Sequence, residues 1–286
     1  MVRGCGFQRG DHVCWTYRSD DEHRRVLSEY FSEGASAGDK LVYVASGRQQ
    51  ARLLEHLSDA GERPHVLIRQ GQLTLANIYD AYVRHGRFDP SERLQQYEAE
   101  VKQALTEGFS GLRVAGEAAS VARHPAVNGD WAGFELRADL MAARLPFVGL
   151  CGYDLRDCDG IDLEVVKAVH TRGLHDGSSE ASMFRLHAAS GGVLALEGEV
   201  DLTCASTVAE LLRSTQADIA QLRVDVSRLA FIDVAGMREL ALTAAAASAG
   251  VVSRICGASP MFRKMWALLE YDKLDGVQLN GCEATA

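Results

Sequence analysis

The chain has 286 residues and a formal charge of −9, with 47% hydrophobic and 24% charged residues. This composition is that of a globular protein, so a largely disordered or collagen-like chain is excluded, and the length favours two domains. Acidic residues outnumber basic ones both before and after residue 180. Neither half therefore has the basic surplus that duplex nucleic-acid binding requires.

The first residues lead directly to the charged side chains of Arg9 and Asp11, with no apolar signal core. Its longest weakly polar run, residues 240–252, is shorter than the roughly 20 residues that span a bilayer. We therefore expect a cytoplasmic protein with no membrane segment. The seven cysteines are scattered without a Cys-x-x-Cys pair, so most should be free thiols, and a structural zinc site is not favoured.

Apolar runs alternate with helical stretches over the first 172 residues. Strands are expected at 12–17, 41–45, 65–69, 112–116 and 147–151, and helices at 19–33, 48–60, 89–107, 131–145 and 163–171. The region 71–87 gives a weaker indication of a helix. Apolar, β-branched strands without alternation are typical of parallel sheets buried on both faces. The pattern predicts a three-layer α/β sandwich, in which ligands bind at the carboxyl ends of the strands.

The first strand-to-helix turn, residues 17–23, lacks the features of a phosphate-binding loop. It contains neither glycine nor lysine, and its three acids, Asp20, Asp21 and Glu22, would repel a polyphosphate. The sequence contains no GxGxxG or GxSxG motif. Nucleotide hydrolysis and a serine nucleophile elbow are therefore not favoured.

Residues 10–172 resemble the MEDS domain, the methanogen/methylotroph sensory domain. The resemblance rests on the segment 12–17 with Asp21 and Glu22, and on the segments 38–44, 112–117 and 147–154. It implies a RecA/KaiC-like parallel sheet without a Walker motif over a domain 1–172. It also implies a sensory role.

Six residues near strand ends are candidates for binding the sensed ligand: His12, Cys14, Tyr17, Glu117, Cys151 and Tyr153. If the strand ends converge, these side chains surround one crevice, which could bind a small organic molecule or act as a redox switch. A metal ion or a haem at His12, Cys14 and Cys151 is left open. Core packing of the thiols is favoured over metal binding, so no cofactor is predicted.

A polar Gly/Ser-rich segment, 173–181, is the predicted linker to a second domain, 182–286. A hairpin is expected over 184–198 and further strands at 222–226 and 251–256. Helices are expected from 206, over 236–248 and from 259. Phe262, Met265, Trp266 and Leu269 recur at helical spacing and are expected in the core. The pattern predicts a small α/β domain with helices on one side of a mixed sheet.

Residues 183–280 resemble a STAS domain, the fold of anti-sigma factor antagonists, through the segments 196–202, 222–229, 231–237 and 257–260. The resemblance implies that the domain binds an anti-sigma factor or a related regulator. The partner-binding residues that it implies are Asp201, Thr203, Asp233, Val234, Ala235, Gly236 and Met237.

One position departs from the antagonist pattern. Antagonists usually carry a serine directly before the glycine at this helix start, and its phosphorylation breaks the complex with the partner. This chain has Val234 and Ala235 there, so the acceptor hydroxyl is missing, while Asp233 can cap the helix. We therefore expect control by the N-terminal domain and not by phosphorylation at this site.

The sequence predicts a non-enzymatic signalling protein. A sensor domain is expected to gate a STAS output domain that influences sigma-factor-dependent transcription by binding other proteins. Two alternatives stay open: a small-molecule enzyme using His12, Cys14 and Glu117, and a stressosome-like scaffold in which the chain forms a homo-oligomer.

Overall fold

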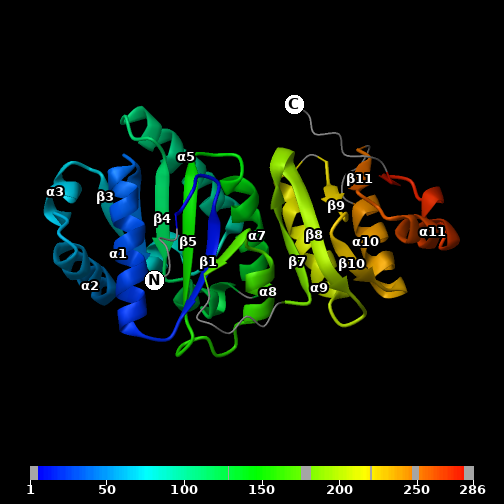
Figure 1. Cartoon of the computed structure of the whole chain (residues 1–286), viewed down its shortest axis with the longest axis horizontal. Helices are drawn as coiled ribbons and strands as arrows, with labels where there is room; N and C mark the ends of the chain where they lie inside the picture. Colours follow the sequence, from blue (N-terminus) through cyan, green and yellow to red (C-terminus); the bar gives the residue numbers. More distant parts are fainter. Residues whose placement is uncertain (1–5, 128, 175–181, 220, 247–250, 280–286) are drawn as a thin grey trace. The chain divides into compact units, whose positions relative to one another are not determined.

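The computed structural model describes residues 6–127, 129–174, 182–219, 221–246 and 251–279. The chain divides into two compact units (Figure 1). Unit 1 comprises Met1–Trp131, Met141–Leu163 and Thr171–Ser179, and unit 2 comprises Ala132–Leu140, Glu164–His170 and Glu180–Ala286. Among the described helices, none has both the length and the apolar character that a membrane span needs.

Unit 1 is built on a six-stranded sheet whose pairings are all parallel, in the order β3-β2-β4-β5-β1-β6. The strands are β1 (His12–Tyr17), β2 (Lys40–Ala45), β3 (Leu73–Asn77), β4 (Leu112–Gly116), β5 (Phe147–Asp154) and β6 (Arg172–Leu174). The helices that precede residue 170 are α1 (Asp20–Ser36), α2 (Gly47–Asp59), α3 (Pro64–Arg69), α4 (Ile78–Tyr82), α5 (Pro90–Thr106), α6 (Ala118–Ala122), α7 (Trp131–Ala142) and α8 (Leu163–Ala168), and most of α7 and α8 belongs to unit 2. The predicted parallel α/β architecture is confirmed.

Helices cover both faces of this sheet (Figure 1). On one face, β1 residues Val13 and Trp15 share a core with Leu27 of α1 and Leu53 of α2. On the other face, the ring of Tyr97 in α5 packs against Phe147 of β5, with centroids 5.5 Å apart. Because side chains alternate along a strand, neighbouring residues of each strand serve different faces.

The expected strand at 65–69 is wrong, because this segment is helix α3. Pro64 occupies the first turn, where a missing N–H costs no hydrogen bond, and Val66 N donates to Arg63 O over 2.8 Å. The third strand is instead β3, which pairs with β2 from Leu41↔Leu73 onward. The region 71–87 thus holds β3 and the short helix α4 instead of one helix.

Unit 2 contains a mixed sheet, as predicted, in the order β10-β8-β9-β11-β12, with β7 antiparallel to β8. Its strands are β7 (Phe184–Ala189), β8 (Val193–Val200), β9 (Arg223–Asp225), β10 (Leu229–Ile232), β11 (Ser253–Cys256) and β12 (Val277–Leu279). Its further helices are α9 (Ala205–Ser214), α10 (Val234–Ala246) and α11 (Pro260–Leu268). The sequence did not indicate β10 or β12.

The core of unit 2 draws on all three of its segments. Leu136 and Leu140 of α7 and Val169 belong to the same buried cluster as Leu186 of β7 and Leu212 of α9. Phe262 and Trp266 are buried in this cluster, and Met265 and Leu269 pack against it, so the predicted stripe is confirmed as core.

The remaining expectations concern the linker and the cysteines. Residues 173 and 174 of the predicted linker lie in β6, and 175–181 lie outside the described residues. Cys14, Cys151, Cys158 and Cys204 are not in disulfides, as expected for most of the cysteines, whereas Cys256 is disulfide-bonded.

Candidate functional site

The six predicted sensor residues do not surround one crevice, because they lie on opposite faces of the unit 1 sheet. Tyr17 belongs to the core that α1 covers. His12 and Cys14 lie an odd number of positions from Tyr17 and therefore face the other side. Cys14 is in register with Cys151, and Thr16 with Tyr153, so both β5 residues share the face of Cys14. The structure thus offers two separate groups of side chains.

The first group centres on Glu117, a carboxylate that is only 3% exposed. Tyr17 Oη donates to its Oε2 over 2.7 Å, and Tyr43 Oη donates to its Oε1 over 2.6 Å. His23 Nε2 lies 2.7 Å from the same Oε1. We call Glu117, Tyr17, Tyr43 and His23 the Glu117 network. It joins the end of β4 to β1, β2 and α1.

Local structure places each member of the network. β4 ends at Gly116, and Glu117 N donates to Val44 O over 3.1 Å, which holds the carboxylate beside β2. His23 lies in the first turn of α1, whose N-cap Ser19 accepts from Glu22 N over 3.2 Å. The sequence had indicated Tyr17 and Glu117. It had not indicated His23 or Tyr43. The only signal for Tyr43 was a phenol in a mostly apolar strand, and His23 stood among the charged residues at the start of α1.

The phenols of the network are held in their neutral, donating form. Burial raises the pKa of Tyr17, and the negative charge of Glu117 raises it further. The same two causes, burial first, raise the pKa of Tyr43 well above its ordinary value. Hydrogen bonds from such donors satisfy a carboxylate that is removed from water.

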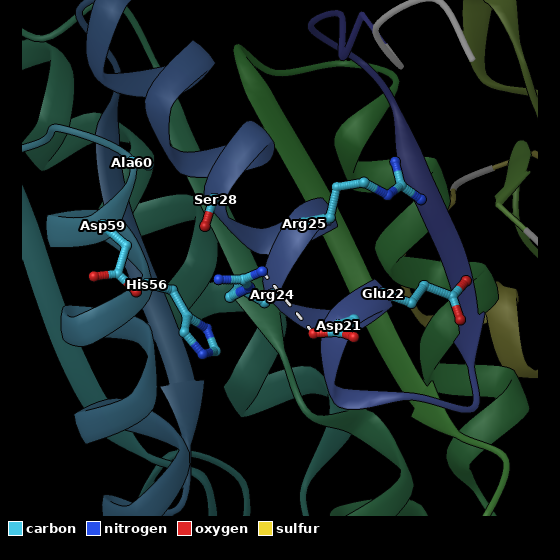
Figure 2. A pocket seen from close by; sticks show the side chains of 8 residues that line it. All are labelled: Asp21, Glu22, Arg24, Arg25, Ser28, His56, Asp59 and Ala60. Atoms are coloured by element: carbon cyan, nitrogen blue, oxygen red, sulfur yellow. Dashed lines mark ion pairs between the residues drawn. The ribbon is translucent and has the colours of Figure 1, made fainter. Parts of the chain in front are cut away.

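A surface pocket of about 640 Å³ lies between α1 and α2 on the same side of the sheet. Figure 2 shows its side chains, among them His56 of α2 and the Arg24–Asp21 ion pair of α1. The ring centroid of His56 lies 6.5 Å from that of His23, which is buried. Burial lowers the pKa of His56, and the nearby His23 lowers it further. A line of polar rings therefore runs from this pocket to Glu117.

The second group lies on the other face of the sheet, where Cys151 Sγ is 3.3 Å from His12 Nε2. Gly149 makes this approach possible, because a Cβ there would lie 2.8 Å from His12 Cδ2. Cys14 is fully buried, and Tyr153 Oη accepts a hydrogen bond from Trp131 Nε1 over 2.8 Å. Imidazole and thiol are ligands for soft metals and also the parts of a redox-active pair.

Unit 2 has a buried histidine–carboxylate pair of its own. His170 Nε2 lies 3.6 Å from Glu135 Oε2, and both side chains are fully buried. His170 Nδ1 lies 2.7 Å from Val166 O. The sequence had not indicated this pair, because neither residue lies in a recognisable motif.

The start of α10 is organised by Asp233. Its Oδ1 accepts from Gly236 N over 2.7 Å, which caps the helix, and its Oδ2 accepts from Leu202 N over 2.9 Å. The second bond fixes the loop between β8 and α9. In that loop Asp201 accepts from Thr203 N over 2.8 Å, and hydrogen bonds from Thr203 lower the pKa of Asp201. The predicted capping role of Asp233 is confirmed.

Exposed apolar side chains lie around Asp233. Leu202 is 75% exposed, Val234 55% and Phe231 51%. We call Leu202, Phe231, Asp233, Val234 and Ala235 the α10 surface.

Asp201 and Thr203 lie in the neighbouring loop, and the last two residues predicted to contact a partner, Gly236 and Met237, are buried. Met237 is fully buried in the core, and Gly236 is buried so tightly that a Cβ would lie 2.8 Å from Val200 Cγ1. Conversely, Leu202 and Phe231 were not predicted from the sequence, although Leu202 stands between two predicted contact residues and Phe231 stands two positions before Asp233.

Two family models match the chain. Residues 11–171 match the MEDS domain, described as the methanogen/methylotroph, DcmR sensory domain, and residues 187–282 match the STAS domain. The two resemblances seen in the sequence are confirmed, in the same order along the chain. A sensory domain followed by a STAS domain is the arrangement of a signalling or regulatory protein. A comparison with curated proteins gave no match.

Proposed function

Because the chain belongs to the MEDS family and carries a STAS domain after the MEDS domain, we propose that it is a non-enzymatic signalling protein. Its N-terminal domain senses a small ligand or a redox state. Its STAS domain binds an anti-sigma factor or a related regulator and thereby influences sigma-factor-dependent transcription. The sensory domain gates this binding in place of phosphorylation.

The observation that carries this proposal is the first turn of α10. Asp233 caps the helix, and Val234 and Ala235 stand between it and Gly236, so the turn offers no hydroxyl to a kinase. Exposed Leu202, Phe231 and Val234 offer an apolar contact of the kind that a protein partner covers. This surface is therefore suited to binding a protein partner, but it lacks the serine whose phosphorylation usually breaks the complex.

Two features support a sensory role of the N-terminal domain. The Glu117 network is a buried polar assembly whose hydrogen bonds share one acceptor group and join three strands to α1. The His12–Cys151 pair can respond to oxidants or to a soft metal. Metal analysis and an absorption spectrum of the purified protein test for a bound metal or haem. A haem gives a Soret band, and another metal appears in stoichiometric amount.

Phosphorylation tests the output half of the proposal. The full-length protein is incubated with radiolabelled ATP and a purified anti-sigma factor of the serine-kinase type. We expect no incorporation into the wild-type protein and incorporation into the Ala235→Ser variant, because only the variant places a hydroxyl at the helix start. Ser227→Ala, which changes a nearby turn hydroxyl, should behave as the wild type.

Stoichiometric labelling of the wild-type protein near Gly236 would contradict control without phosphorylation. Partner binding is measured separately, by calorimetric titration of the same anti-sigma factor. Val234→Asp, which places a charge on the exposed apolar surface, should weaken that binding at least about ten-fold. Equal binding of the wild-type and Val234→Asp proteins would contradict the proposed surface.

A further inference from the structure

A second cavity in unit 1, of about 690 Å³, lies on the face of the sheet opposite to the Glu117 network. Val42 of β2 and Leu112 of β4 form an apolar floor with Ala76 of the edge strand β3. Helices α4 and α5 provide the walls. The volume is within the range of small-molecule sites, and the floor is apolar as in such sites.

The wall contributed by α5 holds a buried cation, Arg93, whose side chain is only 6% exposed. Its guanidinium carbon lies 3.7 Å from the ring centroid of Tyr97 and 5.5 Å from that of Tyr82. Nη1 donates to Gln96 Oε1 over 3.0 Å and to Glu100 Oε1 over 3.2 Å. Within the part of the chain that the structure describes, Nε is buried and has no hydrogen-bond partner.

Glu100 meets this guanidinium through one oxygen only. Its Oε1 accepts from Arg93, while its Oε2 is buried and has no partner among the described residues. A guanidinium pairs best with a carboxylate through two parallel N–H···O bonds. The pair is therefore incomplete, and Glu100, which is partly exposed, can be displaced by a better-placed carboxylate.

We propose that this cavity, which we call the Arg93 cavity, binds a small monocarboxylate with an apolar tail. The carboxylate pairs with Arg93 in place of Glu100, and the tail lies on Val42, Ala76 and Leu112. Lys40 and Arg84 also line the cavity, where they form ion pairs with Glu107 and Glu92, respectively.

The lining favours a monoanion over a phosphate or a neutral ligand. Asp80 and Glu100 lie in the wall and would repel a dianion. The buried charge of Arg93, only partly compensated, favours a ligand that carries the opposite charge. Binding of the carboxylate does not depend on the proposed function. Only the idea that the bound carboxylate is the sensed signal rests on it, so ligand binding and the signalling role can fail separately.

Isothermal titration calorimetry on the full-length protein tests the site, with sodium benzoate as the charged probe and benzamide as its neutral counterpart. We expect benzoate to bind at millimolar concentrations and benzamide to bind at least about ten-fold more weakly. Glu100→Gln should tighten benzoate binding by about three-fold or more, because it removes the competing carboxylate. Arg93→Gln should abolish the binding while the circular dichroism spectrum is retained.

Glu98→Gln is the matched control, since it removes a carboxylate from the same helix outside the cavity. It should leave benzoate binding unchanged. The proposal is overturned if benzoate gives no heat with both the wild-type and Glu100→Gln proteins, if benzamide binds as tightly, or if Glu98→Gln acts like Glu100→Gln. If the Arg93→Gln variant does not fold, the two glutamate variants and the comparison with benzamide still test the proposal.

Discussion

Glu117 is a carboxylate removed from water and held by two phenols and an imidazole. Burying a charge costs several kcal/mol unless hydrogen bonds replace its hydration. Each donor of the Glu117 network is therefore worth more than a surface hydrogen bond, because the group left behind after its removal stays buried. The energetic importance of Tyr17, Tyr43 and His23 follows from the burial of their shared acceptor.

The Tyr43→Phe substitution isolates one donor of the Glu117 network. It removes a single hydroxyl and leaves Glu117 Oε1 with one contact fewer, so the free energy of unfolding should fall by about 1.5–3 kcal/mol. Urea unfolding followed by circular dichroism measures the change. Tyr79→Phe is the control, because Tyr79 is 44% exposed and should change stability by less than about 0.5 kcal/mol. Equal effects of the two substitutions would contradict the assigned role of Tyr43.

The buried tyrosines also predict how stability depends on alkaline pH. Burial raises the pKa of four tyrosines above the ordinary value: Tyr17, Tyr30, Tyr43 and Tyr82. In the unfolded chain the same phenols ionise near pH ~10. The folded protein then binds more protons than the unfolded one above that pH. The contribution of these phenols to the free energy of unfolding is therefore fully present below pH ~10, and it is lost as the pH rises further.

An ultraviolet titration of the tyrosines measures this difference. In the native protein only some of the eight tyrosines should ionise at pH ~11. The others should ionise only as the circular dichroism signal of the fold disappears. The guanidinium-unfolded chain is the reference, in which all should ionise together. A native protein that titrated like this reference would show that the phenols are not buried as described.

At the scale of elements, the sequence predicted the central strands better than the edge. β1, β4 and β5 are buried on both faces, and their apolar runs carry that information directly. The edge strand β3 has exposed positions such as Thr74, so its pattern is weak. The run 65–69 has the composition of a buried strand, but Pro64 starts a helix there.

The same reasoning explains which site residues could be predicted. Alternation correctly placed His12 and Cys14 on one face, and register brings Cys151 to them. It equally places Tyr17 on the other face, so one crevice for all six residues was excluded by the spacing within β1. The contact of His23 with Glu117 joins elements far apart in the chain, and no local pattern predicts such a contact.

Asp233 provides a test at the scale of one helix. The Asp233→Ala variant loses the cap of α10 and also the bond to Leu202 N, so the free energy of unfolding should fall by about 1–2 kcal/mol. Urea unfolding of the full chain measures this loss. Asp233→Asn keeps a capping oxygen and should recover most of it. A larger loss for asparagine than for alanine would contradict a capping role.

At the scale of the whole molecule, the units and the family matches divide the chain differently. The STAS match covers residues 187–282, whereas unit 2 also includes Ala132–Leu140 and Glu164–His170. Within unit 2, Asp139 Oδ2 accepts from Ala188 N over 2.6 Å, and Arg137 Nη2 donates to Asp218 Oδ1 over 3.0 Å. These segments supply core side chains and polar contacts that the matched range alone lacks.

A fragment of residues 182–286 should therefore be less stable than unit 2 in the intact chain. Loss of Leu136, Leu140 and Val169 exposes their partners in the core cluster, so we expect a lower melting temperature and self-association in size-exclusion chromatography. In the full chain, Leu136→Ala should cost about 2–5 kcal/mol, and Leu105→Ala, at an exposed leucine, should cost far less. A monomeric fragment that melts with the intact chain would contradict this.

The Glu117 network has a further consequence for how the sheet can assemble. A slip of β1 by one residue against β5 would move Tyr17 to the opposite face and leave Glu117 Oε2 without its donor. A slip of β2 would do the same to Tyr43. Apolar strands alone tolerate such errors, because one aliphatic side chain replaces another. The shared carboxylate thus discriminates against misregistered sheets, because a slip adds the free-energy cost of an unsatisfied buried charge to that of lost packing.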